Sequence, residues 1–328
     1  MTKSKLPQDF LDMSEAFGRD FSLVQGAGGN TSIKRDGLMH IKASGTVLSD
    51  ANKKDIFVPV ELSQDPYAEK FPEVNGVKPS IETSLHLLLQ HKIVAHVHAA
   101  SVIALAVLVD AKAALEETLS EFSWVFVPYC KPGKSLAYQV ASEIQHNVNQ
   151  PNVIILGNHG LVVGGNSPAE VTGLVEKVVS QVKTVTRNYN HDSFTISLCD
   201  NSCPAGFVRA DSDFAHLSAC DSHALSIVTG GTLYPDHVVF LKRGALSVML
   251  GETVPSKRDS DLILIPNIGA YVPEGATRAA HEMAGAIGLI ASQIPHGFTV
   301  NYLSQENEDE LLNWDAEKYR HKLALEPN

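Results

Sequence analysis

The spacing of apolar residues changes along the chain, and each spacing predicts a type of element. Phe10, Met13 and Phe17 recur at helical intervals, which predicts an amphipathic helix over residues 9–24. Residues 93–99 are almost continuously apolar, which is typical of a buried strand. The same criteria predict strands at residues 31–34, 38–43, 56–58 and 124–128, and helices at residues 79–86, 111–119, 136–147 and 168–189.

Periodicity is lost between residues 191 and 210, which we interpret as a linker. A second segment of mixed pattern follows it. Its predicted helices cover residues 214–229, 277–293 and 306–323, and its predicted strands cover residues 237–241, 246–250 and 262–266.

Short strands joined by hairpin turns, such as the turn at residues 35–37, favour a mainly antiparallel sheet over a doubly wound parallel one. We therefore predict an α/β fold with two domains. Residues 1–198 are expected to form a three-layer α/β/α sandwich around a central, mainly antiparallel sheet. Residues 199–328 are expected to form a smaller α/β domain.

The composition excludes several classes of partner. The 328 residues are 44% hydrophobic and 19% charged, with a formal net charge of −11 and no basic run, which argues against nucleic acid and anionic membranes. The longest apolar run is too short and too polar to span a bilayer. The N-terminus has no apolar core after its lysines, and the four cysteines do not form a disulfide framework. We expect a cytoplasmic protein.

The apolar strand at residues 93–99 carries two histidines, His96 and His98. Residues two apart on a strand project to the same side, so the two imidazoles are expected side by side. Burying them without partners is costly, and a divalent metal ion would supply the partner. The spacing alone is weak support for a metal site, because one or two further ligands must come from elsewhere.

Two further residues extend this candidate site. His159 lies between glycines where the apolar run at residues 153–163 is interrupted, so we expect a kinked strand there and a plausible third ligand. Glu82 falls in the first turn of the helix predicted to begin with Ser80 as its N-cap. Its carboxylate either complements the helix dipole or faces the histidine strand as a ligand or general base.

The glycine-rich stretch at residues 25–30, QGAGGN, has two interpretations that the sequence leaves open. It is either a tight turn from a helix to a strand or a set of exposed N–H groups that bind an anion. It is not a dinucleotide fingerprint, because it precedes a strand instead of opening a helix. Cys199 and Cys203 have no second cysteine pair nearby, so we do not expect them to bind metal.

Five stretches in this order, GAGGNTS, KASGT, PSIETSLH, HVHA and GNHGLVV, resemble the class II aldolase/adducin family over roughly residues 10–189. Fuculose-phosphate and rhamnulose-phosphate aldolases and ribulose-phosphate 4-epimerase belong to that family. The stretches PDHVVFLKR, LILIPNIGAY and NWDAEKYRHKL also resemble the region that follows the aldolase domain in fused rhamnulose-phosphate aldolase/dehydrogenase proteins.

The resemblance implies a zinc ion, or another divalent transition metal, on His96, His98 and His159, with Glu82 as fourth ligand and catalytic acid/base. It also implies a phosphate cradle, whose residues would be Gly29, Asn30, Ser44, Gly45 and Ser80. The implied reaction is cleavage or formation of a carbon–carbon bond in a ketose, sugar acid or sugar phosphate through an enediolate. A homotetramer or another homo-oligomer is implied as well.

Two positions depart from the fuculose-phosphate type. Ile81 stands where that type has a second serine before the catalytic glutamate, which weakens the case for a phosphorylated substrate. Between residues 115 and 126 the chain has no tyrosine to match the one that those aldolases use. Three other functions stay open: sugar-phosphate 4-epimerisation, decarboxylation of a sugar acid with the same metal, and a non-catalytic, adducin-like interaction module.

Overall fold

The computed structural model describes residues 6–145, 150–188 and 203–325, which form two compact units. The first unit comprises residues 1–99 and 116–181, and the second comprises residues 100–115 and 182–328. The domain boundary predicted between residues 198 and 199 lies outside the described residues and stays a prediction.

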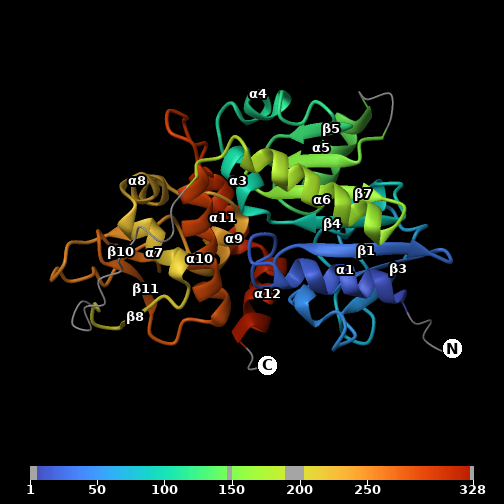
Figure 1. The fold of residues 1–328 in the computed structure, drawn as a ribbon. Coiled ribbons are helices and arrows are strands. Elements are labelled where there is room, and N and C mark those ends of the chain that lie inside the picture. Colours follow the sequence, from blue (N-terminus) through green and yellow to red (C-terminus); the bar gives the residue numbers. More distant parts are fainter. Residues whose placement is uncertain (1–5, 146–149, 189–202, 326–328) are drawn as a thin grey trace. The chain divides into compact units, whose positions relative to one another are not determined.

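The first unit contains a seven-stranded sheet in the order β3-β2-β1-β4-β7-β6-β5 (Figure 1). Every neighbouring pair is antiparallel except β5 and β6, which are parallel. The strands are β1 (Asn30–Arg35), β2 (Leu38–Lys42), β3 (Phe57–Glu61), β4 (Ile93–Val97), β5 (Trp124–Val127), β6 (Val153–Leu156) and β7 (Gly160–Gly165). The predicted mainly antiparallel sheet is thus confirmed, with β4 as its central strand.

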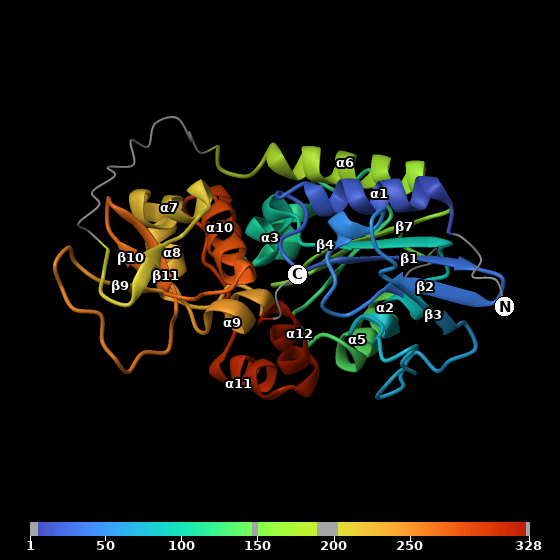
Figure 2. The same ribbon diagram turned by 90° about the horizontal axis from the view of Figure 1, so that it is seen from below.

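Helices cover both faces of this sheet. Figure 2 shows α1 (Gln8–Arg19) and α6 (Pro168–Lys183) on one face, and α2 (Thr83–Leu88) and α5 (Lys134–Gln145) on the other. Leu85 and Leu89 pack with Val94 of β4 in a buried apolar cluster that fixes α2 against the sheet. This arrangement confirms the predicted three-layer sandwich.

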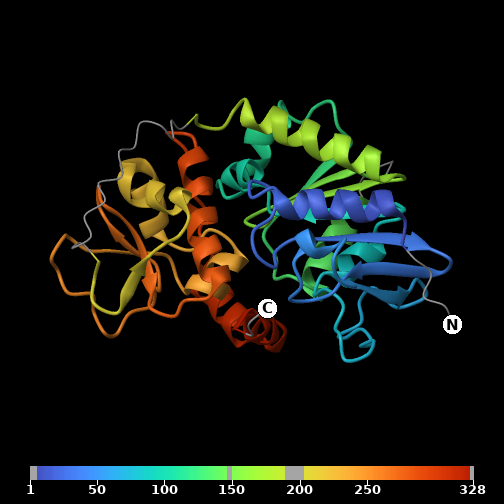
Figure 3. The same ribbon diagram turned by 60° about the horizontal axis from the view of Figure 1, so that its bottom comes forward.

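The second unit combines helices with a four-stranded sheet in the order β8-β11-β10-β9. Its strands are β8 (Phe207–Arg209), β9 (Leu246–Ser247), β10 (Ile263–Ile265) and β11 (Gly269–Pro273). The long helix α10 (Arg278–Gln293) packs against α7 (Asp213–Cys220) and α8 (Ser222–Gly230), as Figure 3 shows in orange-red and yellow. The remaining helices are α3 (Ala100–Ala106), α4 (Ala111–Glu116), α9 (Pro235–Leu241), α11 (Gln305–Asn313) and α12 (Asp315–Leu325). A second α/β unit with a smaller sheet than the first is confirmed.

The strand predicted at residues 237–241 is wrong, because this segment belongs to helix α9. Pro235 occupies the first helical turn, where its fixed φ suits a helix and its missing N–H costs nothing. All residues of α9 are buried. A short apolar run buried on every side has no period that separates a helix from a strand.

Other predicted boundaries shift at polar residues that cap helices. The helix predicted over residues 214–229 is two helices, because the Asp221 side chain accepts hydrogen bonds from the His223 and Ala224 N–H groups and starts α8. The helix predicted over residues 306–323 is also divided, into α11 and α12. The predicted linker at residues 191–210 contains strand β8, while residues 189–202, including Cys199, lie outside the described part.

None of the helices in the described part of the chain is long and apolar enough to cross a membrane.

Candidate metal centre

The central strand β4 places the first two histidines. It is buried along its whole length between β1 and β7, with His96 opposite Asn30 on one side and Val162 on the other. His98 follows one residue after the strand ends. The ring centroids of His96 and His98 lie 4.9 Å apart, so the predicted side-by-side arrangement is present.

His159 lies in the turn between β6 and β7. We expected a kinked strand there, and this was wrong: β6 and β7 pair antiparallel, so the chain reverses direction at residues 157–159. Gly160 allows the turn to approach β4, because a Cβ atom at this position would lie 2.6 Å from the Val97 carbonyl oxygen. The reversal brings the His159 ring to 4.8 Å from the His96 ring, centroid to centroid.

The three imidazoles form one buried cluster. Each offers a nitrogen, and these three nitrogen atoms lie within 4.8 Å of one another. His96 Nδ1 donates a hydrogen bond to the Leu161 carbonyl at 3.1 Å, which holds the other nitrogen, Nε2, toward the cluster. His96 Nε2 faces His98 Nε2 at 3.1 Å. Three buried histidines in this arrangement could bind a metal ion, and histidine nitrogens are common zinc ligands.

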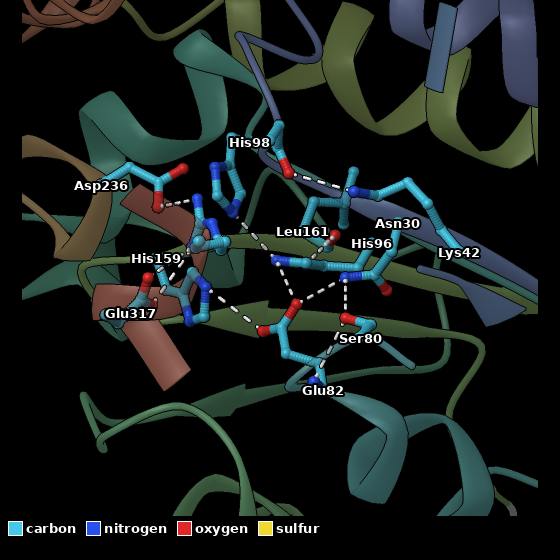
Figure 4. A network of polar contacts seen from close by, with 12 residues as sticks. Asn30, Lys42, Ser80, Glu82, His96, His98, His159, Leu161, Asp236 and Glu317 are labelled. Atoms are coloured by element: carbon cyan, nitrogen blue, oxygen red, sulfur yellow. Dashed lines mark hydrogen bonds and ion pairs between the residues drawn. The ribbon is translucent and has the colours of Figure 1, made fainter. Parts of the chain in front are cut away.

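Glu82 faces the same cluster from the residue that precedes α2 (Figure 4). Its Oε2 lies 3.4 Å from His96 Nε2, and its Oε1 lies 3.3 Å from His159 Nε2. Oε1 accepts no hydrogen bond from the described residues although it is fully buried. A buried carboxylate oxygen aimed at a histidine cluster fits a metal site, because a cation would compensate its charge.

The electrostatic environment keeps Glu82 ionised. Burial raises the pKa of its carboxyl, and the neighbouring His96, His159 and His98 lower it. The hydrogen bond from Asn30 lowers it further, and the resulting pKa is about 2. These surroundings do not fit the alternative interpretation, in which Glu82 only complements a helix dipole.

Helix α2 begins later than predicted. Ser80 is not its N-cap: the helix starts at Thr83 and Glu82 occupies the N-cap position, without a capping hydrogen bond from its side chain. The Ser80 hydroxyl instead accepts hydrogen bonds from the Glu82 N–H at 3.3 Å and from Asn30 Nδ2 at 3.2 Å. Asn30 Nδ2 also donates to Glu82 Oε2 at 2.7 Å. Of the predicted cradle residues, Asn30 therefore contacts the predicted catalytic carboxylate, and Ser80 contacts the main chain of Glu82.

The remaining cradle residues lie on adjoining segments. Gly29 has a φ of 59°, and a Cβ atom there would lie 2.8 Å from the His96 carbonyl oxygen, so a larger residue does not fit. Gly45 has a φ of 78° in the turn after β2. The Ser44 N–H donates to the Lys78 carbonyl, while the Ser44 hydroxyl is buried without a hydrogen-bond partner among the described residues. These positions are consistent with both open interpretations, a structural turn and an anion site.

Two buried residues, Lys42 and His86, were not identified as candidates from the sequence, although they lie within two of the five stretches that resemble the family. Lys42 of the KASGT stretch is 2% exposed, and its ammonium donates to the carbonyls of Ala27 and Thr46. It thereby joins the glycine-rich loop to the turn after β2. His86 of the PSIETSLH stretch is fully buried and hydrogen bonds to Ser32. Ala27 and Ser32, which contact Lys42 and His86 respectively, lie on other segments, so local spacing carries no signal for these two contacts.

Comparison with known proteins finds relatives of this chain. The chain is 27% identical over 184 residues to the uncharacterized oxidoreductase YuxG of Bacillus subtilis, a match that covers 49% of this chain and 26% of that protein. It is 29% identical over 159 residues to the L-fuculose phosphate aldolase of Methanococcus vannielii, which covers 46% of this chain and 80% of that protein. The chain thus spans about a quarter of the Bacillus subtilis relative.

Solved structures also match. The N-terminal class II aldolase domain of a conserved protein from Thermoplasma acidophilum matches at 23% identity with a TM-score of 0.45, over 56% of this chain and 96% of that one. Residues 8–185, more than half of the chain, match the family described as the class II aldolase and adducin N-terminal domain, and the chain belongs to this family.

Proposed function

We propose that this protein is a metal-dependent aldolase, a carbon–carbon lyase that acts on a ketose, sugar acid or sugar phosphate. The observation that supports this proposal most strongly is the buried Glu82 carboxylate, which lies within 3.4 Å of two imidazole nitrogens of the three-histidine cluster. Three imidazoles and one carboxylate form a donor set that suits Zn²⁺. We propose zinc as the ion, with another divalent transition metal as the alternative.

In this proposal His96, His98 and His159 hold the metal ion, and Glu82 completes the set. When bound, the cation would supply Lewis-acid stabilisation of negative charge that develops on the substrate oxygens, such as the charge of an enediolate. Neutral imidazoles leave the charge of the cation available for this purpose.

Glu82 is the proposed acid/base. It takes and returns the proton at the nucleophilic carbon, and Asn30 orients its carboxylate by the hydrogen bond to Oε2. The second acid, which protonates the other substrate oxygen, is unassigned because residues 115–126 contain no tyrosine. Gly29, Asn30, Ser44, Gly45 and Ser80 are proposed to bind the polar or anionic end of the substrate.

The experiment is a retro-aldol screen over ketose phosphates and sugar acids with the purified, metal-loaded protein. We expect aldehyde release from wild type and less than about 1% of that rate from Glu82→Gln, because the variant cannot transfer the proton. His296→Ala is the control, since His296 is exposed and lies in the second unit. Equal rates for wild type and Glu82→Gln would remove Glu82 from the mechanism.

Product analysis separates the alternatives that use the same residues. An epimerised sugar or released carbon dioxide, with no aldehyde, would identify a 4-epimerase or a decarboxylase. A protein that binds no metal and converts nothing would instead support an adducin-like interaction module. Light scattering tests the proposed homotetramer or other homo-oligomer, and a monomer would contradict it.

A further inference from the structure

One face of β1 makes a row of polar contacts with α2 and the residues that flank it. Alternate residues of a strand share a face, so Asn30, Ser32 and Lys34 project to the same side of β1. Asn30 contacts Glu82, Ser32 contacts His86, and Lys34 donates to the Leu89 carbonyl. We call these three contacts the β1–α2 polar row.

The middle contact of this row is the most completely buried. Ser32 and His86 are both 0% exposed, and Ser32 Oγ lies 2.7 Å from His86 Nδ1. Burial lowers the pKa of His86 to about 3, so the imidazole is neutral and its hydrogen bond to Ser32 is between uncharged groups. Its other nitrogen, Nε2, is buried without a hydrogen-bond partner in the described structure.

Helix α2 does not position Glu82 by itself. It has six residues, well below the length at which a helix is stable alone, and Glu82 precedes it without a capping hydrogen bond from its side chain. The His86 N–H donates to the Glu82 carbonyl at 3.2 Å, which links the two residues through one helical turn. A shift of His86 relative to β1 therefore moves the main chain of Glu82.

We propose that His86, held by Ser32, is a positioning residue for the Glu82 carboxylate. This inference rests on the proposed function, in which Glu82 is the acid/base. The Asn30 contact holds the carboxylate at its tip, and the Ser32–His86 hydrogen bond holds the helix that carries it. Both contacts start from the same face of β1, whose residue Asn30 also pairs with His96 of β4, so they fix Glu82 relative to the histidine cluster.

If His86 had only a structural role, the variants would behave differently. An apolar replacement of a buried polar pair can be nearly neutral for folding, and any loss would appear as lower stability alone. A positioning residue, in contrast, affects kcat through Glu82, so its effect disappears when Glu82 has already been replaced.

The variants are His86→Leu, which removes the polar atoms, and His86→Asn, which keeps a polar group at the position of Nδ1. Ser32→Ala removes the other partner. Its matched control is Ser14→Ala, because Ser14 is equally buried and makes a 2.8 Å hydrogen bond to Thr31 on the opposite face of β1. Each variant is made in wild type and in the Glu82→Gln background.

The measurements are kcat, KM, the metal content and the absorption spectrum of the Co²⁺-loaded protein for each variant, and a crystal structure of His86→Leu. We expect His86→Leu to retain the metal, to lower kcat about 10- to 100-fold with little change in KM, and to alter the Co²⁺ spectrum. Ser32→Ala should lower kcat several-fold, His86→Asn should restore most of it, and Ser14→Ala should leave kcat unchanged.

The proposal is overturned if His86→Leu lowers kcat by the same factor with and without Glu82, or if its crystal structure keeps the Glu82 oxygens at their wild-type distances from His96 and His159. If wild type binds no metal and cleaves no sugar, the proposed function is refuted, but the crystal structure of His86→Leu still shows whether His86 positions Glu82. The two failures are therefore distinguishable.

Discussion

Glu82 Oε2 lies 2.7 Å from Asn30 Nδ2 and 3.4 Å from His96 Nε2, so one carboxylate oxygen contacts both a fixed amide donor and the histidine cluster. Because Asn30 and His96 are directly opposite each other on β1 and β4, the sheet register sets this relationship. The geometry therefore places a carboxylate, an amide and three imidazoles within reach of one another.

The first prediction concerns Asn30. Asn30→Ala removes the donor to Oε2 and should lower kcat about tenfold while the metal content stays close to that of wild type. Steady-state kinetics and elemental analysis of the same preparation measure both quantities. Asn52→Ala is the control, because the Asn52 amide donates to the acidic residues Asp12 and Glu15 of α1. Loss of the metal in Asn30→Ala would show that Asn30 supports the site itself.

The second prediction concerns the turn that carries His159. Gly160→Ala would place a Cβ atom 2.6 Å from the Val97 carbonyl oxygen and should lower the free energy of unfolding by about 2–4 kcal/mol and reduce metal binding. Gly173→Ala is the matched control, because no atom lies within 4 Å of its Cβ position and alanine favours a helix by about 1 kcal/mol. Urea unfolding of both variants measures the difference. A Gly160→Ala protein as stable as wild type would contradict this close approach.

The third prediction concerns the substrate. Ile81 precedes Glu82 where the fuculose-phosphate type has a serine, so Ile81→Ser should raise kcat/KM for phosphorylated substrates relative to unphosphorylated ones. Paired assays with a sugar and its phosphate ester test this. An unchanged ratio would mean that the proposed cradle does not bind phosphate.

The fourth prediction concerns the pH dependence of the second unit. His237 is fully buried, with Nδ1 accepting from the Leu233 N–H and Nε2 donating to the Gly244 carbonyl. Burial lowers its pKa from 6.5 to about 4. Between these values the unfolded chain binds a proton that the folded chain does not, so stability falls as the pH is lowered through this window. The loss is up to about 3 kcal/mol.

Denaturant unfolding at pH 7 and pH 4 tests this contribution. His237→Asn should lose less of its free energy of unfolding between the two values than wild type does, because asparagine does not titrate there. His296→Ala should lose as much as wild type, since His296 is exposed. Equal losses in wild type and His237→Asn would contradict the lowered pKa.

Local patterns predicted those parts of the site that local geometry determines. The alternation of a strand is sufficient to place His96 and His98 together, and the position of His159 next to glycine, where the apolar run is interrupted, indicated a third candidate ligand. The reversal at residues 157–159 was missed, because two apolar strand halves look alike whether the chain kinks or turns back. Helix α9 was missed for a related reason, since its buried apolar run has no amphipathic period.

Long-range contacts could not be predicted in this way. His86 has a structural partner 54 residues away in Ser32, and Lys42 reaches a loop 15 residues earlier. Neither relationship leaves a periodic signal, because it depends on the order of strands in the sheet. The position of Glu82 relative to the histidines has the same origin. The residues alone left two interpretations of Glu82 open, and the resemblance to a family favoured the one in which it faces the histidines.

The proposed metal centre is tested most directly by the metal content per chain of wild type and His98→Ala, purified side by side and measured by elemental analysis. We predict close to one zinc ion, or another divalent transition metal, per wild-type chain, and loss of that metal in the variant, because His98 supplies one of three clustered imidazoles. Absence of metal from both proteins, even after reconstitution with Zn²⁺, would contradict the proposed metal centre and with it the lyase.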